Sequence, residues 1–255
     1  MPSLLQFTDT HLTIDPQGTL KGVITRDSLS ACISLAQHQQ ASHVLLTGDL
    51  SHDASQESYH ALQEIITPLN LPVSVLAGNH DIEPNMKKFL PNDWTCGECV
   101  VENWQIIMLN SAVAGEEHGF ITAKEIERAK TILTTTKQDH VLICLHHQPV
   151  PVGSQWIDNI MLKNPEDFFE LIDSNNKVKG ILFGHVHQNF QSHYNNTTII
   201  GSPSTCIQFQ TNSTKFGLDN IAPGFRLLHL NNNGQIDTEL FYLDNIPELK
   251  PNEAY

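Results

Sequence analysis

Short hydrophobic runs recur along the chain, and each is followed at once by polar residues. The clearest runs are residues 4–7, 44–46, 73–76, 141–145 and 181–183. Each has the length of a strand and is rich in β-branched or bulky side chains, which is typical of buried strands. We therefore predict a buried strand at each of these positions.

Helical patterns lie between the runs. Between the first two runs, apolar residues fall at i, i+3, i+4 and i+7, namely at Leu29, Cys32, Ile33 and Ala36. This spacing predicts one face of an amphipathic helix. Helix-start signals predict three more helices, at Asp53 with Gln56, at Thr122 with Glu125, and at Asn164 with Pro165. Strands that alternate with helices predict an α/β fold with at least partly parallel pairing.

The pattern changes after about residue 189. Residues 198–200, 225–230 and 238–242 have the character of strands separated by turns rather than by helices, and we expect a second, more antiparallel sheet there. No repeat or linker divides the chain. The simplest organisation is therefore a single domain over residues 1–255, with a polar tail from about residue 244.

The charge balance limits the choice of partners. The chain has 28 Asp and Glu against 14 Lys and Arg, a formal charge of −14 at pH 7. This balance argues against a broad basic surface for a nucleic-acid polymer or an anionic membrane. No apolar stretch approaches the roughly 18 residues of a membrane-spanning helix, and polar residues occur too early for a signal peptide. We expect a cytoplasmic protein.

The five cysteines are an odd number spread over a long chain, which favours reduced thiols over a disulfide framework. Cys96 and Cys99 form one CxxC motif without a partner pair. We expect this motif to lie in a tight hairpin between Trp94 and Val100 rather than to bind zinc or perform redox chemistry.

Metal-binding residue types follow the predicted strands, where ligands of open α/β sheets bind. The candidates are Asp9, His11, Asp49, Asn79, His146, His185 and His187. In the Asp9-x-His11 and His185-x-His187 pairs, alternate residues share one face of an extended segment. Both side chains of each pair can therefore bind one metal.

Seven candidate groups exceed the ligands of a single ion that keeps an open position, so the sequence predicts two ions. A carboxylate is the group best able to bridge a pair of ions, and Asp49 is the candidate bridge. Two divalent ions about 3.5–4 Å apart activate a water and clamp a phosphoryl oxygen. The constellation predicts hydrolysis of a phosphate ester, and its mixed N and O ligands suit Fe, Mn and Zn alike.

These motifs resemble the calcineurin-like metallophosphoesterase superfamily in order and spacing. Five blocks over residues 4–187 carry the resemblance: Asp9-x-His11, Gly48-Asp49, Gly78-Asn79-His80-Asp81, His146 and Gly184-His185-Val186-His187. Residues 146–154, 201–209 and 223–226 are similar to bacterial class III 3′,5′-cyclic AMP phosphodiesterases. The resemblance implies a four-layer α-β-β-α sandwich with two mixed sheets and a dimetal site at the carboxyl ends of the strands.

The resemblance also implies roles for individual residues. One metal would be held by Asp9, His11, Asp49 and His187, and the other by Asp49, Asn79, His146 and His185. Iron or manganese is the implied metal. A hydroxide held between the metals would attack phosphorus, His80 would protonate the leaving 3′-oxygen, and cyclic AMP would open to 5′-AMP. The implied substrate contacts are His11, Asp49, Asn79, His80 and His187.

Several nearby residues have open roles. An acid that orients His80 is expected, with Asp53 and Asp81 as candidates, although the position at which some relatives carry an acid is His52 here. Asp53 also suits a helix N-cap. His147 belongs either behind a ligand or on the substrate side. We interpret the eight histidines outside the motifs as structural: His38, His43, His52, His60, His118, His140, His193 and His229.

Trp156, Phe209 and Phe225 are candidates to stack on adenine, although packing is the commoner use of aromatic residues. The expected partner is a cyclic nucleotide, and a homodimer is left open. Two other functions compete. The same chemistry could act on another phosphodiester or a nucleotide pyrophosphate, or the chain could be a non-catalytic scaffold of the same fold. A scaffold is expected to have lost ligands, whereas this chain carries all seven candidates and His80.

Overall fold

The computed structural model describes residues 1–251 and contains two mixed sheets. The first comprises β1 (Ser3–Phe7), β4 (His43–Thr47), β5 (Val73–Leu76), β12 (Gly224–Leu230) and β13 (Ile236–Tyr242). The second comprises β6 (Glu98–Val101), β7 (Trp104–Met108), β8 (His140–Leu145), β9 (Val178–Phe183), β10 (Phe190–Tyr194) and β11 (Thr197–Gly201). A separate hairpin consists of β2 (Thr19–Leu20) and β3 (Val23–Ile24).

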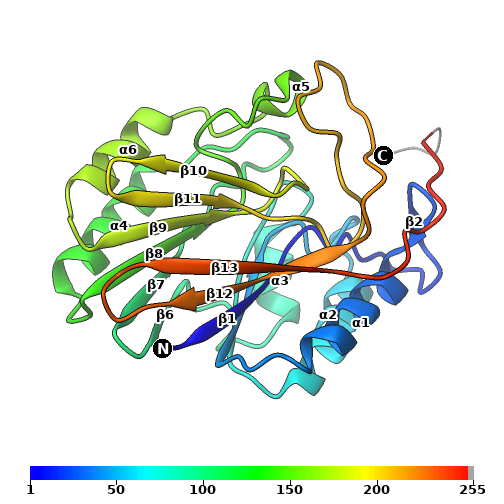
Figure 1. The fold of residues 1–255 in the computed structure, drawn as a ribbon, viewed down its shortest axis with the longest axis horizontal. Coiled ribbons are helices and arrows are strands. Elements are labelled where there is room, and N and C mark those ends of the chain that lie inside the picture. The colour runs from blue at the N-terminus through cyan, green and yellow to red at the C-terminus, as the bar shows by residue number, and fades with distance from the viewer. Residues whose placement is uncertain (252–255) are drawn as a thin grey trace.

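Helices cover the outer faces of the two sheets, as Figure 1 shows. They are α1 (Thr25–Ala36), α2 (Gln56–Ile66), the 3-10 helix η1 (Thr67–Leu69), α3 (Glu83–Phe89), α4 (Ala123–Thr135), α5 (Gln155–Asp158) and α6 (Pro165–Asp173). The first sheet packs on α1 and α2, and the second packs on α4 and α6. A third apolar cluster fills the space between the sheets. The architecture is therefore the expected α-β-β-α sandwich.

The five strands that the hydrophobic runs predict are buried on both faces, namely β1, β4, β5, β8 and β9. In β1, Leu4 packs between the two sheets whereas Leu5 packs against the helices of the first layer. In β8, Leu142 faces the space between the sheets and Ile143 faces α4 and α6. Since successive side chains of a strand point to opposite faces, burial of both faces requires a continuous apolar run.

Parallel pairing joins the strands that precede the polar turns. In the first sheet β1 is parallel to β4, and β4 is parallel to β5. In the second sheet β7, β8, β9 and β11 are parallel neighbours. Antiparallel strands form the remaining pairs, namely β12 with β1, β13 with β12, β6 with β7 and β10 with β11. The turns that follow these parallel strands therefore all lie at the same end of their sheet, where the carboxyl ends of the strands meet.

The expectation of a separate antiparallel sheet after residue 189 is wrong. The C-terminal strands divide between the two sheets, because β12 and β13 extend the first sheet while β10 and β11 extend the second. β12 pairs with β1 over four residue pairs, from Ser3 opposite His229 to Gln6 opposite Arg226. The alternation of strands and turns predicts antiparallel pairs, but it does not specify which free sheet edge each pair joins.

Two local predictions also need correction. The N-cap of α2 is Ser55, whose side chain accepts a hydrogen bond from the Ser58 N–H, and not Asp53. Ala54 lies between them with φ +51°, so Asp53 precedes the helix, and its carboxylate accepts from the Ser55 and Ile14 N–H groups instead. The hairpin expected between residues 94 and 100 is shifted along the chain, because β6 pairs with β7 across a turn at residues 102–103.

The other helix starts are confirmed. Thr122 accepts a hydrogen bond from the Glu125 N–H and begins α4, and Pro165 is the first residue of α6. The Asn164 side chain does not cap α6, however. Its amide instead donates to the Ile121 carbonyl and accepts from the Ile121 N–H.

The polar tail lies against the β2–β3 hairpin, where the Lys250 N–H donates to the Lys21 carbonyl at 2.7 Å. Residues 252–255 of this tail lie outside the described part of the chain. The single-domain organisation over residues 1–255 stays a prediction. Among residues 1–251, no helix is both long enough and apolar enough to cross a membrane.

The cysteine environments predict selective alkylation. Cys96 is exposed, whereas Cys32, Cys144 and Cys206 are buried. Burial raises the pKa of Cys32 to about 12, and it also raises the pKa values of Cys144 and Cys206. Because the thiolate is the nucleophile, native protein treated with iodoacetamide at pH 7.5 should be modified at Cys96 and not at these three thiols. Peptide mass spectrometry measures this, and urea-unfolded protein, in which all cysteines should react, is the control.

Candidate metal centre

Loops at the carboxyl ends of five parallel strands bring all seven candidate ligands together. β1 leads to Asp9 and His11, β4 to Asp49, and β5 to Asn79, so the first sheet supplies four of the residues. β8 leads to His146, and β9 leads to His185 and His187. Asn79 is half-buried, and the other six are buried. The prediction that these strand ends converge is therefore correct.

Asp9, His11 and His187 form the first half of the cluster. His187 Nε2 lies 3.2 Å from Asp9 Oδ1 and 3.4 Å from His11 Nε2. Ligand atoms about 3.0–3.4 Å apart are what a single ion with bonds of about 2.1 Å requires. These three side chains could therefore hold one ion together.

His146 and Asn79 belong to the second half, and Asp49 lies between the halves. His146 Nε2 is 3.2 Å from Asn79 Oδ1 and 3.4 Å from Asp49 Oδ2. The same Asp49 oxygen is 3.7 Å from His11 Nε2 in the first half. One carboxylate oxygen thus faces imidazoles of both halves, which is the position that a bridging ligand requires.

Hydrogen bonds orient the imidazole rings. The Nδ1 atoms of His146 and His187 donate to the backbone carbonyls of Thr47 and Ile207, each at 2.8 Å. A carbonyl only accepts, so Nδ1 carries a proton in both rings, and Nε2 is the nitrogen left to face the cluster and to bind a metal. A hydrogen bond of this kind, from the second ring nitrogen to a carbonyl or carboxylate, is the usual support of a metal-binding histidine.

Two observations indicate that the residues fit metal ions. His185 Nε2 is buried and has no hydrogen-bond partner among the described residues, and a coordinated cation would satisfy such an atom. Five of the seven candidates also have positive φ angles: Asp9, His11, Asp49, His185 and His187. A left-handed backbone costs about 1–3 kcal/mol at each such residue and is concentrated at functional sites.

The charge state of the cluster also suits cations. Burial lowers the pKa of His11 and of His185 well below the usual value, so both are neutral and able to ligate. Burial alone would raise the pKa of Asp49, but the neighbouring His146, His80 and His11 hold it well below the usual range. The pKa of His146 is raised to about 9, because Asp49 and Asp9 outweigh the effect of its burial, so a cation that binds its Nε2 would displace a proton.

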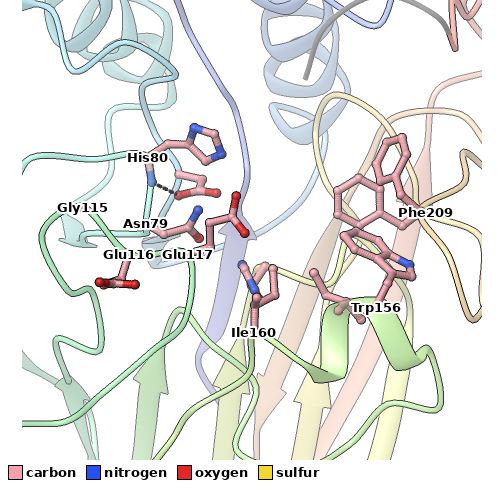
Figure 2. A pocket seen from close by; sticks show the side chains of 12 residues that line it. Asn79, His80, Gly115, Glu116, Glu117, Trp156, Ile160 and Phe209 are labelled. Carbon is pink, nitrogen blue, oxygen red and sulfur yellow. Dashed lines mark hydrogen bonds between the residues drawn. The ribbon is translucent and has the colours of Figure 1, made fainter.

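His80 lies at the open side of the cluster. Its backbone N–H donates to Asp49 Oδ1 at 2.9 Å, which ties the residue to the candidate bridge (Figure 2). Its ring stacks on His52 with centroids 4.7 Å apart and an interplanar angle of 21°. His52 Nδ1 in turn lies 3.2 Å from His11 Nδ1. The interpretation of His52 as an ordinary structural histidine is therefore wrong, since it contacts both a candidate ligand and the candidate catalyst.

The sequence contained one signal for His52, namely its position three residues after Asp49, where some relatives carry an acid. The two acids considered for orienting His80 are engaged elsewhere. Asp81 accepts from the N–H groups of Leu50, Ser51 and Gly78 and from the Tyr59 hydroxyl. Asp53 accepts from Ile14, Ser51 and Ser55. Asp81 thus fastens the loop that carries Asp49 to the loop that carries Asn79, whereas Asp53 fastens the loop of Asp49 to Ile14.

His147 packs behind the candidate ligands rather than facing the substrate side. Its Nδ1 bonds to Ser111 Oγ at 2.9 Å, and its Nε2 donates to the Glu117 carbonyl at 3.2 Å. Its ring contacts those of His146 and His185 at 4.9 and 4.7 Å between centroids. Both nitrogens are occupied, so His147 supports the position of its neighbours.

A cavity of about 520 Å³ opens beside His80. The residues that line its polar side are Asp49, Asn79, His80, His185, Glu116 and Glu117, while His11 and His187 are buried and do not line it. Trp156 and Phe209, two of the three aromatic candidates, also line it. Phe225 does not, because it packs in the core between Phe7 and Phe241.

Gly48 permits the approach of His146, and its replacement should disrupt the cluster. Its φ is +93°, and an added Cβ would lie 2.3 Å from His146 Nδ1. In Gly48→Ala we expect the imidazole to be displaced and the bound metal after reconstitution with Mn²⁺ to fall by half or more, as measured by plasma mass spectrometry. Gly97→Ala is the matched control, with φ +81° and only the Arg128 guanidinium nearby, at 3.3 Å. Wild-type metal content in Gly48→Ala would contradict the expectation.

Three comparisons place the chain among known proteins. A CpdA 3′,5′-cyclic adenosine monophosphate phosphodiesterase from Vibrio vulnificus is 38% identical over 242 residues, covering 93% of this chain and 88% of the relative. A 3′,5′-cyclic-nucleotide phosphodiesterase from Nostoc sp. is 37% identical over 242 residues, covering 93% and 91%. In fold, the chain is similar to a dimetal phosphatase from Danio rerio, with a TM-score of 0.67 at 14% identity over 89% of this chain and 94% of that one.

The family model of the calcineurin-like phosphoesterases matches residues 2–189. This range contains all seven candidate ligands and His80, together with the five parallel strands that position them. The chain belongs to the calcineurin-like phosphoesterase family.

Proposed function

We propose that this chain is a dimetal phosphodiesterase that hydrolyses 3′,5′-cyclic AMP to 5′-AMP and so lowers the cyclic AMP signal. The observation that carries the proposal is the match to relatives named as cyclic nucleotide phosphodiesterases, which spans 93% of the chain and extends well beyond the metal-binding motifs. The complete cluster of candidate ligands supports a catalytic protein over a scaffold that has lost its chemistry. The catalytic domain in this proposal is the single domain over residues 1–255.

In this proposal, each half of the cluster holds one divalent ion. The first ion is held by Asp9, His11, Asp49 and His187, and the second by Asp49, Asn79, His146 and His185. Iron or manganese suits these mixed nitrogen and oxygen ligands, and zinc does so as well. When bound, the ions lower the pKa of a water and neutralise the charge on the phosphoryl oxygens.

The residues of the cavity would then perform the remaining tasks. The half-buried Asn79 and His80 face the cavity, where they can contact the phosphoryl group of the substrate. In the reaction an oxygen from water adds to phosphorus, and the bond from phosphorus to O3′ breaks. His80 would donate a proton to the departing O3′, acting as a general acid from its place in the cavity wall. The product keeps its phosphate on O5′.

The five cysteines are all free among the described residues, which supports a reducing compartment. We therefore include a cytoplasmic location in the proposal. The homodimer stays a prediction, which light scattering tests.

Two substitutions separate catalysis from metal binding. His80→Ala removes the proton donor but no proposed ligand, so turnover of cyclic AMP should fall by about 10²–10⁴-fold while metal content stays at the wild-type value. Asp49→Ala removes the bridge, so metal content and turnover should fall together. Metal analysis and a turnover assay on the same preparations measure both effects. Full turnover in His80→Ala would show that the catalytic assignment is wrong.

A substrate panel with the Mn²⁺-reconstituted protein tests the choice of substrate. The panel contains cyclic AMP, cyclic GMP, bis(4-nitrophenyl) phosphate and a nucleotide pyrophosphate, and kcat/KM is expected to be highest for a cyclic nucleotide. Turnover of the aryl diester without any turnover of cyclic AMP would reject the proposal in favour of another phosphodiester. Absence of bound transition metal after reconstitution would favour the scaffold instead.

A further inference from the structure

The cavity beside His80 has two chemically different walls. One wall carries Asp49, Asn79 and His80, where the phosphoryl group is expected. The opposite wall carries the three aromatic rings of Trp156, Phe209 and Phe216. Figure 2 shows Asn79 and His80 on one side of the cavity and Trp156 and Phe209 on the other. Glu116 and Glu117 also line the cavity. With the two divalent ions of the proposed function in place, the polar wall binds an anion, so a ligand that fills the cavity is anionic at one end and apolar at the other.

The three rings contact one another edge to face. The centroids of Trp156 and Phe209 are 4.9 Å apart with an interplanar angle of 76°, and those of Trp156 and Phe216 are 5.2 Å apart with an angle of 80°. Phe209 and Phe216 complete the set at 5.5 Å. Edge-to-face contacts at these distances are favourable between aromatic rings, so the three rings support each other's orientation.

Phe209 connects this aromatic group to the metal cluster. Its ring lies parallel to that of His187, with centroids 3.9 Å apart and an angle of 11°. It is only 2% exposed, so its surface is already used in packing. Trp156 is half-buried and Phe216 is 39% exposed, and these two present aromatic surface to the cavity.

Backbone contacts hold the two cavity-facing rings in place. Trp156 lies on the short helix α5, and Ser154 directly precedes this helix. The Ser154 hydroxyl donates a hydrogen bond to the Gln210 carbonyl, at the start of the loop that carries Phe216. That loop is closed by a hydrogen bond from the Gln210 N–H to the Gly217 carbonyl at 2.8 Å and by a bridge between Phe209 and Leu218. The aromatic surface is therefore built before any ligand arrives.

A buried cation holds Phe216 from another side. The ammonium group of Lys21 lies 5.1 Å from the centroid of the Phe216 ring, and Lys21 is only 5% exposed. The backbone of Lys21 is bound in turn by the tail, through the Lys250 N–H. A cation over an aromatic face is attractive and occupies that face of the ring. The ring of Phe216, although exposed at the cavity mouth, is thus a fixed surface.

We propose that Trp156 and Phe216 form a platform that binds the nucleobase of the substrate: because the two rings are at 80° to each other, the planar base stacks on one ring and meets the other edge to face. The inference rests on the proposed phosphodiesterase function and adds to it the part of the substrate that the aromatic wall binds. In a 3′,5′-cyclic nucleotide the phosphate is fused to the ribose, so the base is held at one fixed side of the reacting group. The cavity of about 520 Å³ accommodates this shape, because the wall that binds the phosphate faces the wall that carries the aromatic rings.

The test compares cyclic AMP with an analogue that lacks the base, methyl β-D-ribofuranoside 3′,5′-cyclic phosphate. In Trp156→Ala and in Phe216→Ala, KM for cyclic AMP should rise by about 5- to 150-fold, the range expected for loss of a base stacked on an aromatic side chain. Metal content and kcat/KM for the base-free analogue should stay at wild-type values. Trp156→Phe and Phe216→Tyr keep a ring and should retain most of the affinity.

Phe120→Ala is the matched control, because Phe120 is 42% exposed but does not line the cavity. It should leave both substrates unaffected. Equal losses on cyclic AMP and the base-free analogue would show that the rings only support the structure, and would overturn the platform while the phosphodiesterase function stands. Equal kcat/KM for the two substrates in the wild type would also overturn it. A wild type that hydrolyses neither substrate would overturn the proposed function and the platform together.

Discussion

The position of one carboxylate oxygen organises the site. Asp49 Oδ2 lies 3.7 Å from His11 Nε2 and 3.4 Å from His146 Nε2, although these histidines come from different sheets. Its partner oxygen accepts the His80 N–H. Such closeness depends on Gly78, where an added Cβ would lie 2.2 Å from Asp49 Oδ1. The sandwich can thus be understood as a scaffold that holds two sets of strand ends against one acid.

This arrangement concentrates backbone strain at the site. Five of the seven candidate ligands have positive φ, and a non-glycine residue adopts such a conformation only when its surroundings determine it. The surroundings here are strands with fully buried residues on both faces, together with buried hydrogen bonds such as those of Asp81 to the loops. The apolar layers stabilise the sheets enough to keep the loops in this conformation, and coordinated cations would add to that stabilisation.

Much of the fold and the site could be predicted from the sequence because both depend on local patterns. Burial on two faces requires a continuous apolar run, so the strand positions 4–7 and 141–145 were visible directly. The ligands follow these strands within a few residues. Errors arose where the partner is distant in sequence. Asp53 does not begin α2 because its carboxylate accepts from Ile14, 39 residues earlier, and the sheet joined by β12 depends on the free edge of β1. His52 was misjudged because its importance comes from contacts with His11 and His80.

By itself, the sequence determined the class of fold, the strands that end at the site and the residue types that can bind two metal ions, since periodicity and chemical type are properties of short segments. Only the tertiary structure decided which aromatic residues face the cavity. Phe225 is buried in the core, Phe209 stacks on His187, and Phe216, which no motif marked, lies at the mouth of the cavity beside Trp156. The physical reason is that an aromatic side chain has the same chemical structure whether it packs in the core or binds a ligand. The two uses differ only in which groups the folded chain places against the faces of the ring.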